Sequence, residues 1–238
     1  MTGRSMVVER MQNLLQVWEE GHDARAIFLG CYTMMTRNTL EAIEAGEFRD
    51  PTWVFDWLEH FADYYFNALE AFDQSLENLA QPWRFAFDAA REPGTLVLQN
   101  LMLGINAHIN YDLILALSDM LEPDWQGLPE EQRQLRYQDH CTVNAVIART
   151  VDAVQDEVVE RYSPVTNLAD VLLGPVDEWL ASRLIDAWRE RVWRLAVQRT
   201  EAIHPEGREE IRRNIEHKST EQARLILVEG LDRLLDFD

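Results

Sequence analysis

Basic residues are scarce in this sequence. The chain of 238 residues carries 42 acidic and 22 basic side chains, which gives a formal net charge of −20, and Lys218 is its single lysine. Nucleic acids and anionic membrane surfaces attract proteins through clustered lysine and arginine. We therefore expect neither a nucleic acid nor a membrane as a partner.

Cysteine, proline and glycine are also few, at two, eight and ten residues. A β-sandwich or barrel turns about every ten residues and uses proline and glycine at many of those turns. A secreted scaffold of this size usually carries more cysteines, so we interpret Cys31 and Cys141 as reduced core thiols, with a disulfide between them as the less favoured alternative. Residues 1–20 lack the apolar segment of a signal peptide, and we expect a cytoplasmic protein.

Several well-known catalytic motifs do not occur. The sequence has no glycine-rich phosphate loop, no HExxH zinc motif, no CxxC pair and no GxSxG nucleophile elbow. Glu201 and His204 form an ExxH pattern, which a carboxylate di-iron site uses in pairs together with two further glutamates. We interpret this pattern as a helix end.

Apolar residues recur every three to four positions along nearly the whole chain, and no segment alternates with period two for more than a few residues. This spacing predicts helices over residues 6–20, 24–45, 51–72, 82–91, 95–121, 130–162, 176–202 and 208–235. The apolar fraction of 47% and the eight tryptophans exclude a disordered acidic chain. We therefore predict an all-α fold, a single-domain bundle of mostly antiparallel helices over residues 1–238, with residues 205–238 as a C-terminal helical arm or a dimer contact.

Polar residues interrupt the apolar face of the most apolar predicted helix. His108 and Asp112 are four residues apart, so their side chains meet on the face that should point inward. Asn106 and Asn110 form a neighbouring stripe. Gly104 lies one turn before His108, where a missing side chain lets another helix approach closely. So many polar groups at its centre also argue against a membrane span.

The next predicted helix repeats this pattern. His140 and Asn144 fall on its apolar face, and Asp139 borders that face. Burying such groups without partners costs about 1–3 kcal/mol each. Because consecutive helices are expected to be antiparallel, the two clusters could converge on one interior pocket. Asp56 and His60 are also four residues apart, but at a half-exposed position where a solvated pair is the favoured interpretation.

The segment LGINAHINYDL, residues 103–113, resembles the signature helix of an uncharacterised bacterial all-helical domain-of-unknown-function family. Weaker matches extend this resemblance over about residues 23–197. It implies an all-α fold and transfers no activity. The spacing GxxxHxxxD from Gly104 to Asp112 is also similar to a helix of zinc-dependent phospholipase C-like proteins, where His and Asp bind metal. Six histidines are few for a trinuclear site of that kind, so we consider one divalent metal ion, with His108, Asp112 and His140 as ligands.

Three functions remain open. The first is a small-molecule enzyme with an interior pocket, a hydrolase if it holds a metal ion and otherwise an acid–base catalyst in which Asp112 orients His108. Its catalytic candidates are His108, Asp112, Asp139 and His140. Its substrate-binding candidates are Gly104, Asn106, Asn110 and Asn144. The second is a non-catalytic module that binds an apolar ligand in a cavity lined by Trp, Phe and Met. The third is a structural protein whose final helix makes a homodimer. A hydrogen-bonded core pair that only fixes helix register is the alternative for His108 and Asp112.

Overall fold

A long apolar helix runs through the middle of the molecule. In the computed structural model, α5 (Val97–Ala107), the π-helical turn η1 (His108–Asp112) and α6 (Leu113–Leu121) follow one another without a break. The structure describes the backbone of residues 6–154, 162 and 175–228, and the side chains of residues 6–150, 162 and 188–228.

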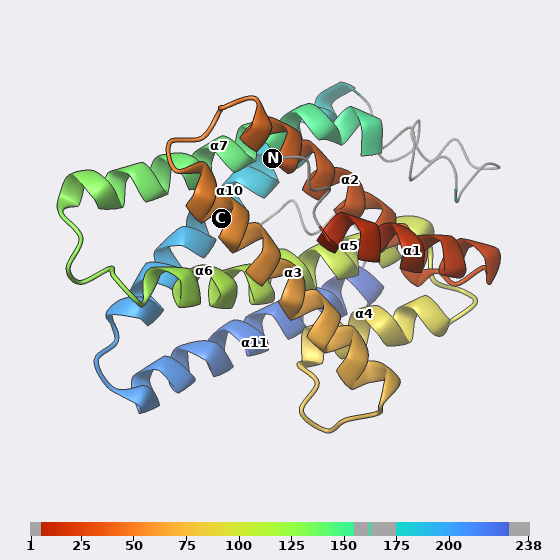
Figure 1. Cartoon of the computed structure of the whole chain (residues 1–238). Helices are drawn as coiled ribbons and strands as arrows, with labels where there is room; N and C mark the ends of the chain where they lie inside the picture. Colours follow the sequence, from red (N-terminus) through yellow and green to blue (C-terminus); the bar gives the residue numbers. More distant parts are fainter. Residues whose placement is uncertain (1–5, 155–161, 163–174, 229–238) are drawn as a thin grey trace.

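The other helices pack around this central helix (Figure 1). They are α1 (Met6–Glu20), α2 (Arg25–Glu44), α3 (Pro51–Asp73), α4 (Gln81–Arg91), α7 (Glu130–Val154), α10 (Pro175–Glu201) and α11 (Pro205–Val228). The described residues contain no strand, and the helices form one compact domain. The prediction of an all-α single-domain fold is confirmed.

Local signals in the sequence account for where several helices begin and end. The Asp50 carboxylate accepts a hydrogen bond from the backbone N–H of Trp53 at 3.0 Å, and Pro51 occupies the first turn of α3. The Asp23 carboxylate accepts from the backbone N–H of Arg25 at 2.9 Å, at the start of α2. Gly46 follows α2 with a φ of 75°, a left-handed conformation that glycine adopts without steric cost.

The central helix is long and apolar enough to cross a membrane, by length and composition alone. However, 83% of its most apolar window is buried inside the protein. α2, α4, α10 and α11 contact it along its length. The core helix of a globular bundle has this same apolar composition, because neighbouring helices cover it on all sides.

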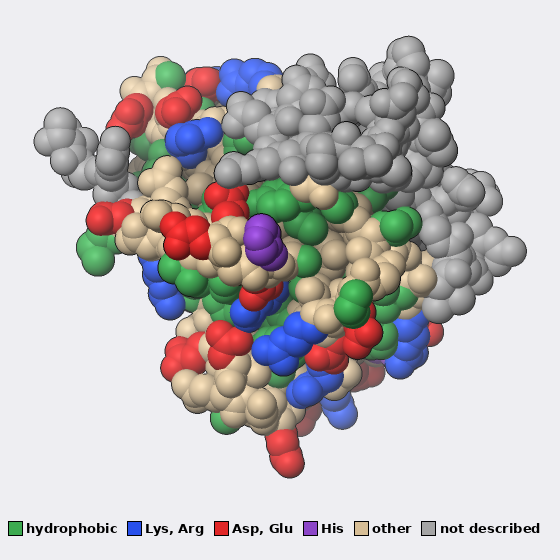
Figure 2. All heavy atoms as spheres, turned by 90° about the vertical axis from the view of Figure 1, so that its right-hand side faces the viewer, with side chains coloured by type: hydrophobic (Ala, Val, Ile, Leu, Met, Phe, Trp, Pro, Cys, Tyr) green, Lys and Arg blue, Asp and Glu red, His purple; other side chains and the backbone are tan. Residues whose placement is uncertain are grey.

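The final helix, α11, belongs to the packed core. Ile215, Ala223 and Ile226 are buried, and the helix contacts α4, α5 and α10. Among the described side chains, the charged residues lie at least partly on the outside, apart from the buried Asp112, Asp139 and Arg189. On the face shown in Figure 2, acidic and basic side chains are interspersed over the described surface, with hydrophobic atoms visible between them.

Some of the predicted segments fall on residues that the structure does not describe. Helix α7 is described to Val154, and the predicted continuation over residues 155–161 lies outside the described residues, as does most of the expected loop at residues 163–175. Both cysteines are free thiols, Cys31 buried and Cys141 partly buried.

Candidate functional site

His108 and Asp112 lie at a local change of helix geometry in the centre of the molecule. The turn His108–Asp112 is π-helical, and the backbone N–H of Leu113 donates to the carbonyl oxygen of His108, five residues earlier. Single π-turns inserted in long helices occur frequently at functional sites. The apolar spacing of the sequence gives no sign of this π-turn. The turn adds a single residue to the helix, and the inward-facing residues before and after it are still apolar.

The two side chains form a buried pair with a third partner. Nδ1 of His108 lies 3.2 Å from Oδ2 of Asp112, and Nε1 of Trp83 donates to the same oxygen at 2.8 Å. The exposed fractions of His108 and Asp112 are 3% and 1%. Trp83 comes from α4. Nothing in the sequence pairs it with Asp112, since the two are 29 positions apart.

Burial favours the uncharged form of both groups. It lowers the pKa of His108 well below its ordinary value, and it raises the pKa of Asp112 well above its own, against the opposing hydrogen bond from Trp83. One arrangement of the two neutral groups has the carboxyl O–H of Asp112 donating to Nδ1 of His108. The neutral imidazole then carries its own proton on Nε2, which becomes a hydrogen-bond donor.

Aromatic rings enclose the imidazole of His108 and leave Nε2 without a polar contact. The ring of Phe61 stacks on it at 3.7 Å with an interplanar angle of 11°, and Tyr32 meets it edge-on at 4.2 Å. Nε2 is buried and has no hydrogen-bond partner in the described part of the chain. Buried polar atoms in proteins are nearly always hydrogen-bonded, so this unpartnered nitrogen calls for an explanation.

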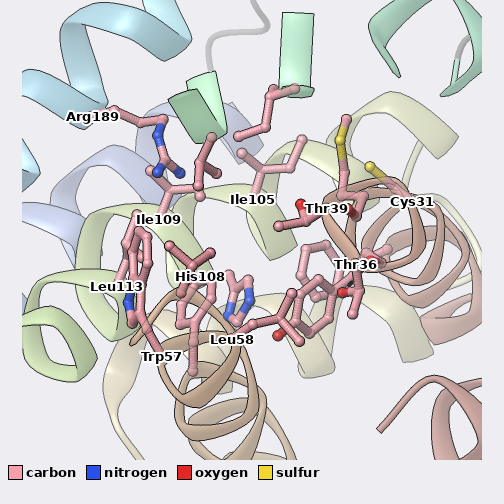
Figure 3. A pocket seen from close by; sticks show the side chains of 17 residues that line it. Cys31, Thr36, Thr39, Trp57, Leu58, Ile105, His108, Ile109, Leu113 and Arg189 are labelled. Atoms are coloured by element: carbon pink, nitrogen blue, oxygen red, sulfur yellow. Dashed lines mark hydrogen bonds between the residues drawn. The ribbon is translucent and has the colours of Figure 1, made fainter. Parts of the chain in front are cut away.

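A cavity of about 120 Å³ adjoins this imidazole (Figure 3). Most of its wall is apolar and comes from α2, α3, the central helix and α7. The polar lining residues are Cys31, Tyr32, Thr36, Thr39, His108 and Arg189.

Three of these six polar lining residues are already satisfied or chemically inert. The hydroxyls of Thr36 and Thr39 donate to the backbone oxygens of Tyr32 and Met35, at 2.8 and 2.9 Å. Burial raises the pKa of the Cys31 thiol to about 12, so this thiol is protonated at neutral pH and is not a nucleophile.

Arg189 brings a buried positive charge to the cavity from α10. Its exposed fraction is 2%, and in Figure 3 its guanidinium lies on the wall near Ile109. Its backbone oxygen accepts a hydrogen bond from Nε2 of His140 at 3.1 Å. Sequence reasoning missed Arg189 as a site residue, because a single arginine in a charged helix gives no inward signal by itself.

The residues of the second predicted cluster, on α7, make contacts away from the cavity. Both carboxylate oxygens of Asp139 accept backbone N–H groups just before α3, from Arg49 at 2.7 Å and from Asp50 at 2.8 Å. His140 packs against Trp57 and Trp193 and does not line the cavity; α7 reaches the cavity through apolar residues instead. Asn144 has a buried side-chain oxygen without a partner in the described chain.

The amides near His108 fasten the central helix to α11. Nδ2 of Asn106 donates to the backbone oxygen of Ser219 at 2.8 Å, and Nδ2 of Asn110 donates to Oδ1 of Asn106 at 3.1 Å. Neither amide lines the cavity. Gly104 also lies outside the cavity, directly against the ring of Phe28, which confirms the close helix approach expected there.

Two weaker sequence candidates are surface features. His60 is half-exposed as expected, but it pairs with Asp119 of α6 at 3.2 Å rather than with Asp56, which is exposed. Glu201 ends α10 and accepts a hydrogen bond from Nε1 of Trp125 at 3.1 Å.

The described side chains do not gather a metal site. No group of three or more His, Cys, Asp or Glu residues that could hold a metal ion occurs among them. Nδ1 of His108 is engaged by Asp112, and His140 donates to a backbone oxygen. The ligand set considered from the sequence, His108, Asp112 and His140, therefore does not fit a metal ion in this part of the chain.

Comparison with known proteins identifies the family. The model of a family of unknown function, DUF5995, matches residues 5–229, and the chain belongs to this family. This match confirms the resemblance to a family of unknown function that was predicted from the sequence. No match was found among curated proteins or among solved structures.

Proposed function

We propose that this protein binds a small, largely apolar molecule in the central cavity and that Nε2–H of His108 donates a hydrogen bond to it. The observation that carries this proposal is the buried, unpartnered Nε2 of a residue that lines an apolar cavity. An unsatisfied buried donor costs about 1–3 kcal/mol. A ligand with an acceptor oxygen removes that cost while its apolar body fills the rest of the space.

The size of the cavity limits the ligand. An engineered protein cavity of about 150 Å³ with apolar walls stays dry and binds benzene or xenon. The present cavity, at about 120 Å³, is slightly smaller. We therefore infer a ligand with one six-membered ring or a short aliphatic chain, carrying one carbonyl, ether or hydroxyl oxygen.

Cyclohexanone and methylenecyclohexane test this proposal, because they have nearly the same shape and differ in the acceptor oxygen. Binding is measured by NMR titration and by the rise in melting temperature. The wild type should bind both molecules. The free-energy gain from the oxygen, corrected for the different water–alkane transfer of the two molecules, should be about 0.5–1.5 kcal/mol.

Two substitutions of His108 separate its two nitrogens. The amide of His108→Asn lies about where Nδ1 was and can still hydrogen bond Asp112, but it provides nothing at the position of Nε2. The amide nitrogen of His108→Gln lies about where Nε2 was. The preference for cyclohexanone should be lost in His108→Asn and retained in His108→Gln. The proposal fails if the wild type binds neither molecule at millimolar concentration, or if both variants keep the preference.

Acid catalysis in the same cavity is a second candidate. It is favoured by the coupling of Asp112 to Nδ1, because a neutral imidazole whose far nitrogen bears a proton can polarise a carbonyl oxygen. Bound cyclohexanone in D2O would then exchange its α-hydrogens faster than free cyclohexanone, and His108→Asn would abolish the acceleration. Equal exchange rates with and without the protein would leave binding as the function.

A further inference from the structure

A second pocket lies between α10 and α11, which form a helical hairpin (Figure 1). It encloses about 240 Å³. Arg191, Arg194 and Lys218 line it, and we call it the basic pocket. The amide side chains of Gln198 and Asn214 complete its polar lining.

The basic pocket is unusual in a chain with 42 acidic and 22 basic residues. Many of the other described arginines contact a carboxylate, such as Arg136 with Asp50 at 2.7 Å and Arg212 with Glu216 at 2.9 Å. No acidic residue lines the basic pocket among the residues that the structure describes.

Within the described part of the chain, Arg191, Arg194 and Lys218 have no ion pair and no hydrogen bond. The amide groups of Gln198 and Asn214 also have no hydrogen-bond partner there. The pocket therefore gathers three cations and two neutral amides that have no protein partner among the described residues; Arg191 is half-buried, and the other four side chains are exposed.

Two charges of the basic pocket, those of Arg191 and Arg194, repel each other. The pKa of Arg191 is lowered, first by burial and then by the positive charge of Arg194, and no carboxylate offsets either effect. Like charges brought together without a counter-charge destabilise a fold. A bound anion would supply the missing negative charge.

We propose that the basic pocket binds a small dianion of the phosphate type, either inorganic phosphate or the phosphate group of a small monoester. Guanidinium groups donate two parallel hydrogen bonds to phosphate oxygens, and lysine adds a compact charge. The amides of Gln198 and Asn214 supply further donors. The net charge of −20 repels large polyanions, but a small ion needs only the local field of the pocket.

This site is separate from the central cavity. Arg189 lines the cavity and Arg191 lines the basic pocket. Two residues that are two positions apart on a helix point in nearly opposite directions. The proposal therefore stands whether or not the cavity binds a ligand.

Phosphate titration of the full chain tests the proposal. Melting temperature and heat of binding are measured in a phosphate-free buffer, with sodium chloride holding ionic strength constant. Inorganic phosphate and glycerol 3-phosphate form the two arms. We expect a saturable rise in melting temperature, as for any ligand that binds the folded state alone. Tighter binding of glycerol 3-phosphate would identify a monoester as the ligand, and tighter binding of inorganic phosphate would identify the free ion.

Single-charge variants separate the pocket from general charge effects. Arg194→Gln and Lys218→Gln should each weaken phosphate binding at least about tenfold, since hydrogen bonds to charged groups are among the stronger ones. Arg213→Gln is the matched control, because it removes one positive charge from an exposed position on α11 and should bind phosphate as the wild type does.

The melting temperature without phosphate shows whether a variant has lost binding because it is misfolded. Without phosphate, Arg194→Gln should melt at or above the temperature of the wild type, because the substitution relieves repulsion with Arg191. The proposal is wrong if phosphate adds nothing beyond sodium chloride at equal ionic strength. It is also wrong if Arg213→Gln weakens binding as much as the pocket variants do.

Discussion

His140 shows how a buried histidine can stabilise a fold while it remains uncharged. Nε2 lies 3.1 Å from the backbone oxygen of Arg189, and because a carbonyl oxygen only accepts, the proton of the neutral ring is on Nε2. Burial, and then the charge of Arg189, lower the pKa of His140 well below its ordinary value of about 6.5. Folding therefore excludes the proton that this residue binds in the unfolded chain.

The free energy of unfolding should fall as the pH drops below about 6.5. The unfolded state then binds more protons than the folded state, which costs up to about 1.4 kcal/mol per pH unit for each such histidine. His140→Gln keeps an N–H near the Arg189 oxygen and removes the titration, so it should flatten this pH dependence by about 1 kcal/mol per unit. Urea unfolding at pH 5.5, 6.5 and 7.5 measures the slope.

The control for this prediction is the exposed His204, where substitution by Gln should leave the slope unchanged. His108 contributes in the same direction as His140, since burial also lowers its pKa. Asp112 acts in the opposite sense, because its raised pKa makes stability fall as the pH rises above about 4. An identical slope in wild type and His140→Gln would show that His140 is protonated in the folded state.

At the scale of residues, periodicity predicted which polar side chains point inward, but it could not predict what they meet there. His108 and Asp139 gave similar signals, since His108 interrupts an apolar face and Asp139 borders one. Asp139 is fully satisfied by two backbone N–H groups from the chain before α3. Nε2 of His108 is buried and has no hydrogen-bond partner among the described residues. The difference depends on segments distant in sequence, and one helical pattern carries no information about them.

At the scale of elements, the contact between α5 and α2 depends on Gly104. A Cβ atom placed on Gly104 would lie 2.5 Å from Cδ2 and 2.7 Å from Cβ of Phe28. The ring of Phe28 also lines the central cavity. The position of this ring therefore links the packing of the two helices to the shape of the cavity.

Gly104→Ala should destabilise the protein and shrink the cavity. Overpacking costs about 1–3 kcal/mol, which outweighs the gain of about 1 kcal/mol in helix propensity. Gly207→Ala in the first turn of α11 is the matched control, because its Cβ would meet nothing closer than 3.9 Å. Urea unfolding and cyclohexanone titration of both variants measure the two effects. A Gly104→Ala protein as stable as the control would mean that Phe28 moves aside freely.

Element boundaries were largely predictable from the sequence, because caps and breakers act locally. Asp50, Pro51 and Gly46 mark the ends of the observed helices close to where they were expected. The π-turn at residues 108–112 was not predictable. It is a small change in hydrogen-bonding register within a helix whose apolar pattern continues on both sides.

At the scale of the whole molecule, the final helix completes the core. Its buried residues and its hydrogen bonds to Asn106 tie it to the centre of the bundle. The homodimer considered from the sequence stays a prediction, but the packing of α11 changes how it should be tested. Removing residues 203–238 would expose core surface, so single charged substitutions on the outer face of α11 are the better probe of self-association.

The charge of the whole molecule predicts how salt affects its stability. Even if every one of the 22 basic residues were paired with a carboxylate, 20 of the 42 acidic residues would have no positive partner. The repulsion among them opposes folding, and salt screens it over a distance that shrinks from about 10 Å at 0.1 M to about 3 Å at 1 M. Screening also weakens surface ion pairs, but such pairs contribute only about 0–1 kcal/mol each.

The excess of like charge should dominate, so raising sodium chloride from 0.05 to about 0.5 M at constant pH should raise the melting temperature by a few degrees. Potassium chloride should act equally if screening is the cause, and a melting temperature that falls with either salt would show that the ion pairs outweigh the repulsion.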